Sequence, residues 1–385
     1  MKIGIVGARL AGSYAGLLLS RLGHEVLLFD HAAEEEKPCG GGVTFKAIRK
    51  MPWFAESSLP HAKIGTALLS AHDGYAGSLL LPHPIHIFSR RSIDSHLLQW
   101  AIQSGTRFLP ERALHFAKDR KTWRIKTKAG AFEVDYLVGA DGANSSVRAA
   151  LVGRHASLDL SLALGYVLPN AYHPGTVRIA FQESGFQGYM WSFPRVDQTS
   201  VGIIRRLPGA HASDLKRRVE EFIAVHYPDA GDERAFYAAT VPCLRHRSLI
   251  QQRVCGEHWA LLGDAAGFTD PLTAEGIYYA LRSAELLADS FHRGDPSRFE
   301  TRWRMDFLAD LERASHWRDH VFTGMVLSRT FIRRSLQAVR YSGVIQMLLD
   351  NLISGNISYK VLLRNLVFRS PQILAQALRR KLVYD

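Results

Sequence analysis

The sequence predicts an α/β fold that combines a parallel sheet, an antiparallel sheet and a helical C-terminal region. Three observations lead to this prediction. A strand, a glycine-containing turn, a helix and a second strand follow one another over residues 1–30. Apolar and polar residues alternate over residues 160–205, as they do in antiparallel strands. From residue 296 onward, apolar residues recur at helical spacing.

The first unit of this fold spans residues 1–30. Residues 2–6 form a short apolar run with β-branched members, which predicts a buried strand. Gly7 permits the tight turn that follows, and Gly12 allows the next helix to pack closely on the strand. A second apolar strand ends at Asp30, where an acid can accept hydrogen bonds from ribose hydroxyls. This βαβ pattern of the Rossmann type predicts a dinucleotide site.

One residue departs from the usual glycine pattern of such a turn. Arg9 stands where the middle glycine is expected, so its side chain must point away from a diphosphate or pair with a phosphate. Leu10 and Ala11 begin the helix, whose first N–H groups are available to an anion. We therefore keep Arg9, Leu10 and Ala11 among the predicted cofactor-binding residues.

The next segment contains the sequence KPCGGGVT, residues 37–44. Gly41 and Gly42 belong to a run of three glycines, which allows backbone to approach a flat ligand closely. A plain flexible loop is the alternative interpretation. After an expected hairpin, Arg91 precedes an amphipathic helix, where its side chain is either solvated or in contact with a phosphate or flavin.

Two further strands are predicted to join the dinucleotide-binding unit. Residues 135–141, DYLVGAD, form one, and residues 259–262 form the other. The second runs into GDAAGFTDPLTAEG, residues 263–276, which opens a long apolar helix ending near Phe291. Each strand thus ends in a loop with glycine and an aspartate, Asp141 and Asp264.

An aromatic stripe occurs within the predicted antiparallel sheet. Residues 188–194 read GYMWSFP, and strand alternation places Tyr189, Trp191 and Phe193 on one face. The alternative interpretation is an ordinary aromatic core.

Composition limits the class of protein. The 385 residues are enough for two or three domains, and 47% hydrophobic with 22% charged residues is typical of a folded globular chain. Cys39, Cys243 and Cys255 lie far apart, so we expect no metal or iron–sulfur site and a reducing cytoplasmic location. We expect no signal peptide, because a βαβ unit starts at residue 2, and no uncharged apolar stretch is long enough to span a bilayer.

The net charge is +12, and residues 302–385 hold fourteen Lys and Arg against six Asp and Glu. No nucleic-acid recognition motif accompanies this charge, so we expect no nucleic-acid partner. A solvated basic surface and attraction to anionic lipid remain as interpretations.

Three motifs now stand together: GARLAG with Asp30, GADGANSSVR at residues 139–148, and GDAAGFTDPLTAEG. In order and spacing they resemble the flavin-binding signature of the p-hydroxybenzoate-hydroxylase-fold flavoproteins, over residues 1–295. The resemblance implies FAD as the cofactor. It implies that Arg91 lies near the flavin or pyrophosphate, that Asp141 closes the cofactor entry and that Asp264 accepts from the ribityl chain.

The resemblance also implies that backbone near Gly276 lies beside the isoalloxazine, where a neutral loop at a helix N-terminus would offer N–H groups. The full set of expected FAD-binding residues is Gly7, Arg9, Leu10, Ala11, Gly12, Asp30, Gly41, Gly42, Arg91, Asp141, Gly263, Asp264, Gly276 and Ile277.

Two more motifs narrow the resemblance to one family. KPCGGGVT, and GYMWSFP followed by Gly202, are similar to the P-x-x-C-G-G-G and Y-x-W-x-F-P signatures of the geranylgeranyl reductase family. This resemblance implies hydride transfer from N5 of reduced FAD to a C=C bond of an isoprenoid chain, with Cys39 as proton donor or relay. Tyr189 and Trp191 would line the substrate tunnel as catalytic residues, together with the substrate-binding residues Gly42 and Phe193.

Other functions are compatible with the same expected fold. The main alternative is a FAD-dependent monooxygenase that hydroxylates an aromatic or hydrophobic small molecule. A non-catalytic flavoprotein that carries lipid or electrons is a second. Flavin halogenases carry W-x-W-x-I-P, from which Tyr189 and Phe193 depart. No second dinucleotide fingerprint is present, so the reductant would be external, either NADPH or a ferredoxin-type donor.

The expected division places a FAD-binding domain at residues 1–160 and 240–300, a β-sheet substrate domain at 161–239 and a helical region at 301–385. Residues 325–349 interleave apolar side chains with Arg329, Arg333, Arg334 and Arg340 and contain no acid. Peripheral contact with a membrane is one interpretation of this segment. Packing of its apolar face inside the protein is the other.

Overall fold

The computed structural model describes residues 1–33, 35–169, 175–326, 329–339 and 342–373. They form two compact units, each assembled from three separate segments. The first unit comprises Met1–Lys37, Arg90–Leu160 and Thr240–Glu312. The second comprises Pro38–Ser89, Ser161–Ala239 and Arg313–Asp385.

The first unit is built on a six-stranded sheet in the order β16-β17-β10-β1-β2-β6. All neighbours pair in parallel except β16 and β17, which are antiparallel. Its strands are β1 (Lys2–Val6), β2 (Glu25–Phe29), β6 (Arg107–Leu109), β10 (Tyr136–Gly139), β16 (Cys255–Gly256) and β17 (Trp259–Leu261). Apart from Lys2 and Glu25 at the first positions of β1 and β2, the central strands β1, β2 and β10 contain no charged residue, because a parallel sheet is covered on both faces.

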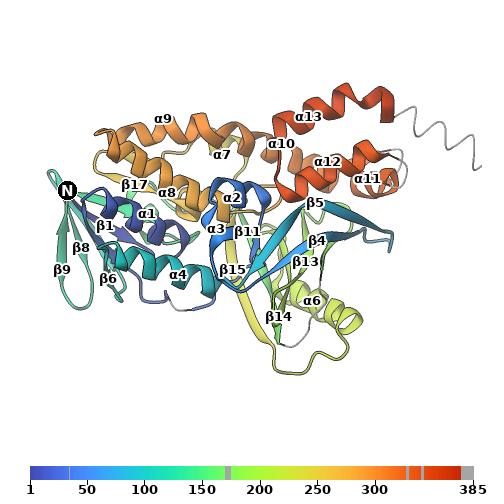
Figure 1. The fold of residues 1–385 in the computed structure, drawn as a ribbon, viewed down its shortest axis with the longest axis horizontal. Helices are drawn as coiled ribbons and strands as arrows, with labels where there is room; N and C mark the ends of the chain where they lie inside the picture. Colours follow the sequence, from blue (N-terminus) through green and yellow to red (C-terminus); the bar gives the residue numbers. More distant parts are fainter. Residues whose placement is uncertain (34, 170–174, 327–328, 340–341, 374–385) are drawn as a thin grey trace, which may run out of the picture. The chain divides into compact units, whose positions relative to one another are not determined.

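The first unit also contains a smaller sheet and several helices. A small antiparallel sheet contains β7 (His115–Asp119), β8 (Thr122–Lys126) and β9 (Ala131–Val134). The helices are α1 (Leu10–Arg21), α4 (Arg90–Gln103), α5 (Ser146–Leu151), α7 (His246–Gln251), α8 (Ile277–His292), α9 (Phe299–Trp303) and the start of α10 (Ala309–Thr323). Helix α1 packs against both α4 and α8, as Figure 1 shows.

The second unit contains an eight-stranded sheet in the order β15-β11-β14-β13-β12-β4-β5-β3. Its strands are β3 (Gly42–Val43), β4 (His61–Ser70), β5 (Ala76–Phe88), β11 (Leu160–Pro169), β12 (Thr176–Phe181), β13 (Gly188–Pro194), β14 (Gln198–Arg206) and β15 (Ala235–Pro242). Strands β11 to β12 pair antiparallel through β14 and β13, as do β4, β5 and β3, whereas β12 and β4 run parallel.

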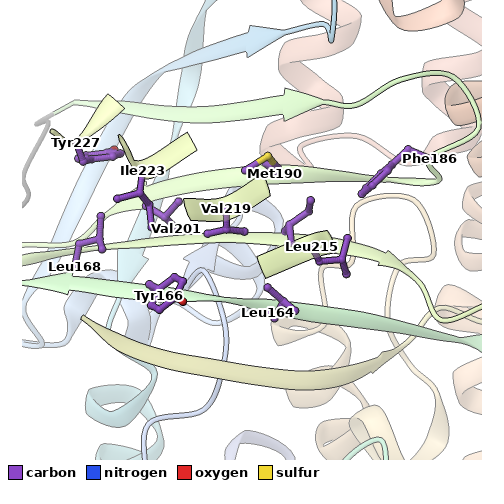
Figure 2. Close-up of a cluster of buried hydrophobic side chains, with 11 residues drawn as sticks. Leu164, Tyr166, Leu168, Phe186, Met190, Val201, Leu215, Val219, Ile223 and Tyr227 are labelled. Carbon is purple, nitrogen blue, oxygen red and sulfur yellow. The ribbon is translucent and has the colours of Figure 1, made fainter. Parts of the chain in front are cut away.

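One face of this sheet is covered by α6 (Ala212–His226), whose apolar side chains pack on β11, β13 and β14. Figure 2 shows the resulting core. It contains Leu164, Tyr166, Leu168, Phe186, Met190, Val201, Ile203, Leu215, Val219, Ile223 and Tyr227. Met190 points into this core, so its neighbours in sequence, Tyr189 and Trp191, belong to the opposite face of β13.

The C-terminal helices belong to the second unit and are α11 (Phe331–Val339), α12 (Gly343–Ser354) and α13 (Tyr359–Phe368). Helices α11 and α12 pack on β5, and α13 packs on α12 (Figure 1). Short helices α2 (Phe45–Lys50) and α3 (Trp53–Glu56) complete the unit. None of the helices in the described ranges is long and apolar enough to cross a membrane.

The observed units differ from the predicted division in two ways. Residues 38–89, expected in the first domain, lie in the second unit because β4 hydrogen-bonds to β12. The expected separate region 301–385 is divided between the two units at Glu312. The long apolar helix that residues 271–276 are expected to open is observed as α8, which ends at His292, close to the predicted Phe291. Part of residues 325–349 forms the strands β18 (Met325–Val326) and β19 (Arg329–Thr330).

Candidate functional site

The turn between β1 and α1 leaves no room for side chains at its two glycines. Gly7 has a φ of +100°, and a Cβ there would lie 2.3 Å from the carbonyl oxygen of Ala140. A Cβ on Gly12 would lie 1.7 Å from the carbonyl oxygen of Gly7. The structural roles predicted for both glycines are therefore confirmed. This close crossing leaves the first N–H groups of α1, from Leu10 onward, at an open helix end.

Arg9 is directed to the segment that follows β2. Its guanidinium Nη2 donates to the carbonyl oxygen of Ala32 over 3.3 Å. This bond links the turn after β1 to the segment after β2, and the predicted position of Arg9 relative to a diphosphate stays a prediction.

Asp30 ties the same two loops together. Its Oδ2 accepts from the N–H of Ala8 and its Oδ1 from the N–H of Ala32, both over 2.8 Å. A carboxylate has about four acceptor positions, so both oxygens retain capacity for ribose hydroxyls.

Asp264 is held by a lysine that the sequence reasoning missed. The Nζ of Lys37 lies 2.8 Å from Asp264 Oδ2, and Thr269 Oγ1 donates to Oδ1 over 3.3 Å. Burial alone would raise the pKa of Asp264, but the charges of Lys37 and Arg90 outweigh burial and lower it. The carboxylate is therefore ionised at neutral pH, as an acceptor for hydroxyl donors must be.

The loop 263–276 brings Asp264 beside the start of α8. A Cβ on Gly276 would lie 3.4 Å from Asp264 Oδ1, which places the beginning of α8 next to the carboxylate. Glu275 Oε1 accepts from the N–H of Tyr278 over 2.7 Å, so one N–H group at the start of α8 is already bound within the protein. The expected position of this backbone beside the isoalloxazine stays a prediction. Ala274 has a φ of +57°, a left-handed conformation that costs a non-glycine residue about 1 kcal/mol.

Arg91 is exposed, whereas Arg90 is buried. Arg90 Nη2 donates to both carboxylate oxygens of Asp94, over 3.0 and 3.1 Å. The carboxylate of Glu36 accepts the N–H groups of Arg90 and Arg91, and so caps α4. The part predicted for Arg91 stays a prediction.

Asp141 has a clear local function. Its Oδ2 accepts from the N–H groups of Ser146 and Val147, over 2.7 and 3.2 Å, at the beginning of α5. The side chain thus caps a helix, and its predicted position at the cofactor entry stays a prediction.

The residues above fit a flavin dinucleotide. Two helix N-termini, two glycines whose Cβ positions are blocked and two aspartates follow the ends of parallel strands in one sheet, where α/β proteins bind such ligands.

In the second unit, the glycine loop of residues 40–42 packs against the aromatic strand. A Cβ on Gly40 would lie 2.4 Å from Phe193 Cδ2, and one on Gly42 would lie 3.4 Å from Phe193 Cε2. Gly41 has a φ of +81°, and its Cβ would lie 2.0 Å from the carbonyl oxygen of Phe88. The two motifs that suggested one family are therefore in contact.

Cys39 is anchored through its backbone. Its carbonyl oxygen accepts from Arg195 Nη2 over 3.1 Å and from Ser200 Oγ over 3.3 Å. The Sγ atom accepts from the N–H of Gly41 over 3.3 Å, and the thiol is free and partly buried.

Ser200, which binds the Cys39 carbonyl, also belongs to a buried polar cluster. Ser200 Oγ is 2.9 Å from the hydroxyl of Tyr237, and Trp191 Nε1 donates to Ser200 Oγ over 3.3 Å. Burial raises the pKa of Tyr237 far above its usual range, so this phenol stays protonated. Arg195 follows the Y-x-W-x-F-P motif directly and could have been suspected, whereas nothing in the sequence marked Ser200 or Tyr237.

The predicted substrate aromatics lie on one strand face but differ in exposure. Trp191 is buried, and its ring covers Gly202, where a Cβ would lie 2.4 Å from Trp191 Cζ2. Tyr189 is partly buried, and its ring centroid lies 6.3 Å from that of Trp191 in an edge-to-face arrangement. These two rings contact each other, and the ring of Phe193 lies against the glycine loop that follows Cys39.

Comparison with known proteins gives a family match and consistent relatives. A family described as FAD binding domain matches residues 1–292. Geranylgeranyl diphosphate reductase of Synechocystis is 26% identical over 323 residues, which cover 75% of this chain and 75% of that protein. Menaquinone reductase of Mycobacterium tuberculosis is 28% identical over 329 residues, covering 76% of this chain and 77% of that protein.

The fold comparison extends over nearly the whole chain. A geranylgeranyl bacteriochlorophyll reductase-like protein from Thermoplasma acidophilum superposes with a TM-score of 0.78 at 18% identity, covering 97% of this chain and 98% of that one. The fold is therefore that of the p-hydroxybenzoate hydroxylase type, as the sequence predicted.

Proposed function

This chain belongs to the FAD binding domain family, and on that premise we propose that it hydrogenates C=C bonds in the isoprenoid chain of a prenyl lipid. It is a FAD-dependent oxidoreductase similar to the geranylgeranyl reductases. The observation that carries the proposal is the contact of the Cys39 glycine loop with Phe193 of the aromatic strand. The names of the relatives support a prenyl substrate but leave its head group open.

The first unit supplies the residues that would hold FAD. The N–H groups at the start of α1 would bind the pyrophosphate, Asp30 the ribose and Asp264 the ribityl chain. The Lys37 ammonium keeps Asp264 ionised for this purpose. FAD, when bound and reduced, supplies the hydride.

The second unit supplies the residues proposed for substrate and proton. An isolated alkene has no carbonyl to polarise, so positioning and proton supply must lower the barrier. Cys39 is the proposed proton donor, because a thiol is ordinarily protonated at neutral pH and the loop that carries it is fixed by Arg195 and Ser200. Tyr189 and Trp191 would pack against the isoprenoid chain.

The proposal includes an external reductant, either NADPH or a ferredoxin-type donor, since the sequence holds no second dinucleotide fingerprint. It also includes peripheral contact with a membrane, because a prenyl lipid is dissolved there.

The deciding experiment mixes photoreduced holoprotein with detergent-dispersed geranylgeranyl diphosphate in the absence of oxygen. We expect flavin absorbance to return and the product to gain two hydrogen atoms. Persistence of reduced flavin with this substrate and with menaquinone would reject the reductase. A product formed only in air and heavier by one oxygen atom would instead identify the monooxygenase alternative.

The same assay tests Cys39. Cys39→Ala should leave photoreduction of the flavin unchanged and slow alkene reduction, by about 10²-fold or more if the thiol is the general acid. Cys243→Ala, which changes a buried cysteine of the first unit, serves as the matched control. Equal turnover of Cys39→Ala and wild-type protein would assign Cys39 to packing.

A further inference from the structure

Helix α13 exposes large apolar side chains near its C-terminus. Val367 and Phe368 are 68% and 76% exposed, although Tyr359 at the other end of the helix is buried. An α-helix advances by 100° per residue, so Lys360, Arg364, Val367 and Phe368 share one side of α13. All four are exposed, and one face of the helix therefore carries both cations and apolar groups.

The charge around this face has one sign. From Asn351 to Ile373 the sequence contains Lys360, Arg364 and Arg369 and no Asp or Glu. Within the described part of the chain, none of these three cations forms an ion pair. Their charges therefore remain available to an anionic partner.

Residues 325–349, for which the sequence suggested membrane contact, do not offer their described arginines in the same way. Arg333 on α11 pairs with Asp73 over 3.3 Å, and its guanidinium lies 3.9 Å from the ring centroid of Tyr75. Arg334 donates to Gln337, while Ile332 and Leu336 are buried. The side chain of Arg329 and the whole of Arg340 lie outside the described residues. Helix α11 thus contacts the turn between β4 and β5 through Arg333. Both of its described arginines, Arg333 and Arg334, bind other side chains of the protein.

We propose that the exposed face of α13 docks on the surface of an anionic lipid bilayer. Phe368 and Val367 would enter the boundary between head groups and acyl chains, while the aliphatic stems of Lys360 and Arg364 lie along it with their charges at the phosphates. The proposal rests on the proposed function only in that a prenyl substrate would be drawn from the same lipid phase.

Flotation of the FAD-loaded protein with phosphatidylcholine vesicles doped with phosphatidylglycerol tests the proposal. We expect binding that weakens with salt and falls about fivefold for each of Lys360→Gln and Arg364→Gln. The double variant Val367→Ser and Phe368→Ser should abolish it. Val225→Ser on α6, where the valine is 73% exposed, is the matched control and should float like wild type.

Equal flotation of the α13 variants and wild type, or equal binding to pure phosphatidylcholine, would overturn the proposal. So would absence of flotation together with a change of oligomeric state in Val367→Ser, Phe368→Ser, since the face would then be a contact between copies. Anaerobic turnover in detergent needs no vesicle. The same α13 variants should retain it, which separates failure of docking from failure of the proposed reaction.

Discussion

At the scale of single residues, the ion pair of Lys37 and Asp264 has the largest consequence for the first unit. The two side chains are only 29% and 15% exposed. The pair of Lys118 and Glu257 in the same unit has the same 2.8 Å separation, but its side chains are 32% and 72% exposed. Water and salt screen the second pair far more than the first, so the two pairs offer a controlled comparison.

We expect Lys37→Met to lower the free energy of unfolding of the FAD-free protein by about 2 kcal/mol, because it leaves the Asp264 carboxylate enclosed without its cation. Asp264→Asn should weaken FAD binding by about 1.5–3 kcal/mol, the worth of one charge-assisted hydrogen bond. Urea unfolding and titration of flavin fluorescence measure the two effects. Lys118→Met should change neither, and similar losses from both lysine variants would show that the enclosed pair has no special weight.

Asp350 on α12 is a buried acid whose effect on the free energy of unfolding can be measured. It is 7% exposed, its Oδ1 has no hydrogen-bond partner within the described residues, and burial raises its pKa to about 6. The native state therefore holds a proton that the unfolded state has lost between pH 3.8 and 6, and stability from this group falls as pH rises through that window.

Asp350→Asn should accordingly stabilise the protein by about 1–2 kcal/mol at pH 7 and by nothing at pH 4. Urea unfolding at the two pH values checks the difference. Asp229→Asn, at an exposed aspartate of the same unit, is the control. A gain that is the same at both pH values would mean that the charge of Asp350 is not the cause.

At the scale of elements, β13 and the glycine loop show how one strand fixes another segment. Met190 faces the α6 core, and this orientation turns Phe193 to the opposite face, against Gly40 and Gly42. The space that the phenyl ring occupies is the space that a Cβ on Gly40 would need. Gly40 is thus required by packing as well as by any ligand.

Gly40→Ala should cost about 1–3 kcal/mol in unfolding free energy, because its Cβ would lie 2.4 Å from Phe193 Cδ2 and an aromatic ring cannot bend away. Gly42→Ala is the matched control from the same loop, since its Cβ would meet the ring at 3.4 Å. Adding Phe193→Leu to Gly40→Ala should recover part of the loss. Chemical unfolding measures these free energies. Equal losses of unfolding free energy in Gly40→Ala and Gly42→Ala would contradict the packing argument.

These elements also show what the sequence could and could not predict. Periodicity predicted β1, α1, β2 and the hairpin of β4 and β5, because each is a local pattern of apolar residues. It did not predict that β4 pairs with β12, since pairing of distant strands leaves no local pattern. The burial of Arg90 could not be predicted for the same reason, because adjacent arginines look alike in a sequence and only the fold decides which one is buried.

At the scale of the whole molecule, each unit contains a histidine kept neutral by its surroundings. Burial, with the nearby charges of His61 and Lys63, lowers the pKa of His86 to about 4. Burial and the charge of Arg148 lower the pKa of His155 to about 4, against weaker opposing effects of Asp159 and Asp264. Both groups gain a proton more easily in the unfolded chain, so their contribution to stability is present above pH 6.5 and is lost as pH falls toward 4.

We expect the unfolding free energy to fall by about 2–3 kcal/mol between pH 6.5 and 4, a loss larger than the opposing gain from Asp350. His86→Asn and His155→Asn should each flatten the profile in this range. Urea unfolding as a function of pH measures the slope, with His211→Asn as an exposed control. A slope unchanged in both variants would assign the acid sensitivity to other groups.

The division of each unit among three chain segments has a consequence for the order in which the protein can form during synthesis. Strand β17 pairs with β10, and β10 pairs with β1, so the first sheet is incomplete until residue 261 has left the ribosome. Asp264 and α8 follow that strand, whereas Asp30 and Lys37 precede it and are synthesised much earlier. Capture of the flavin would therefore be a late event, and the early βαβ segment would spend most of synthesis as an unfinished sheet with an unpaired edge.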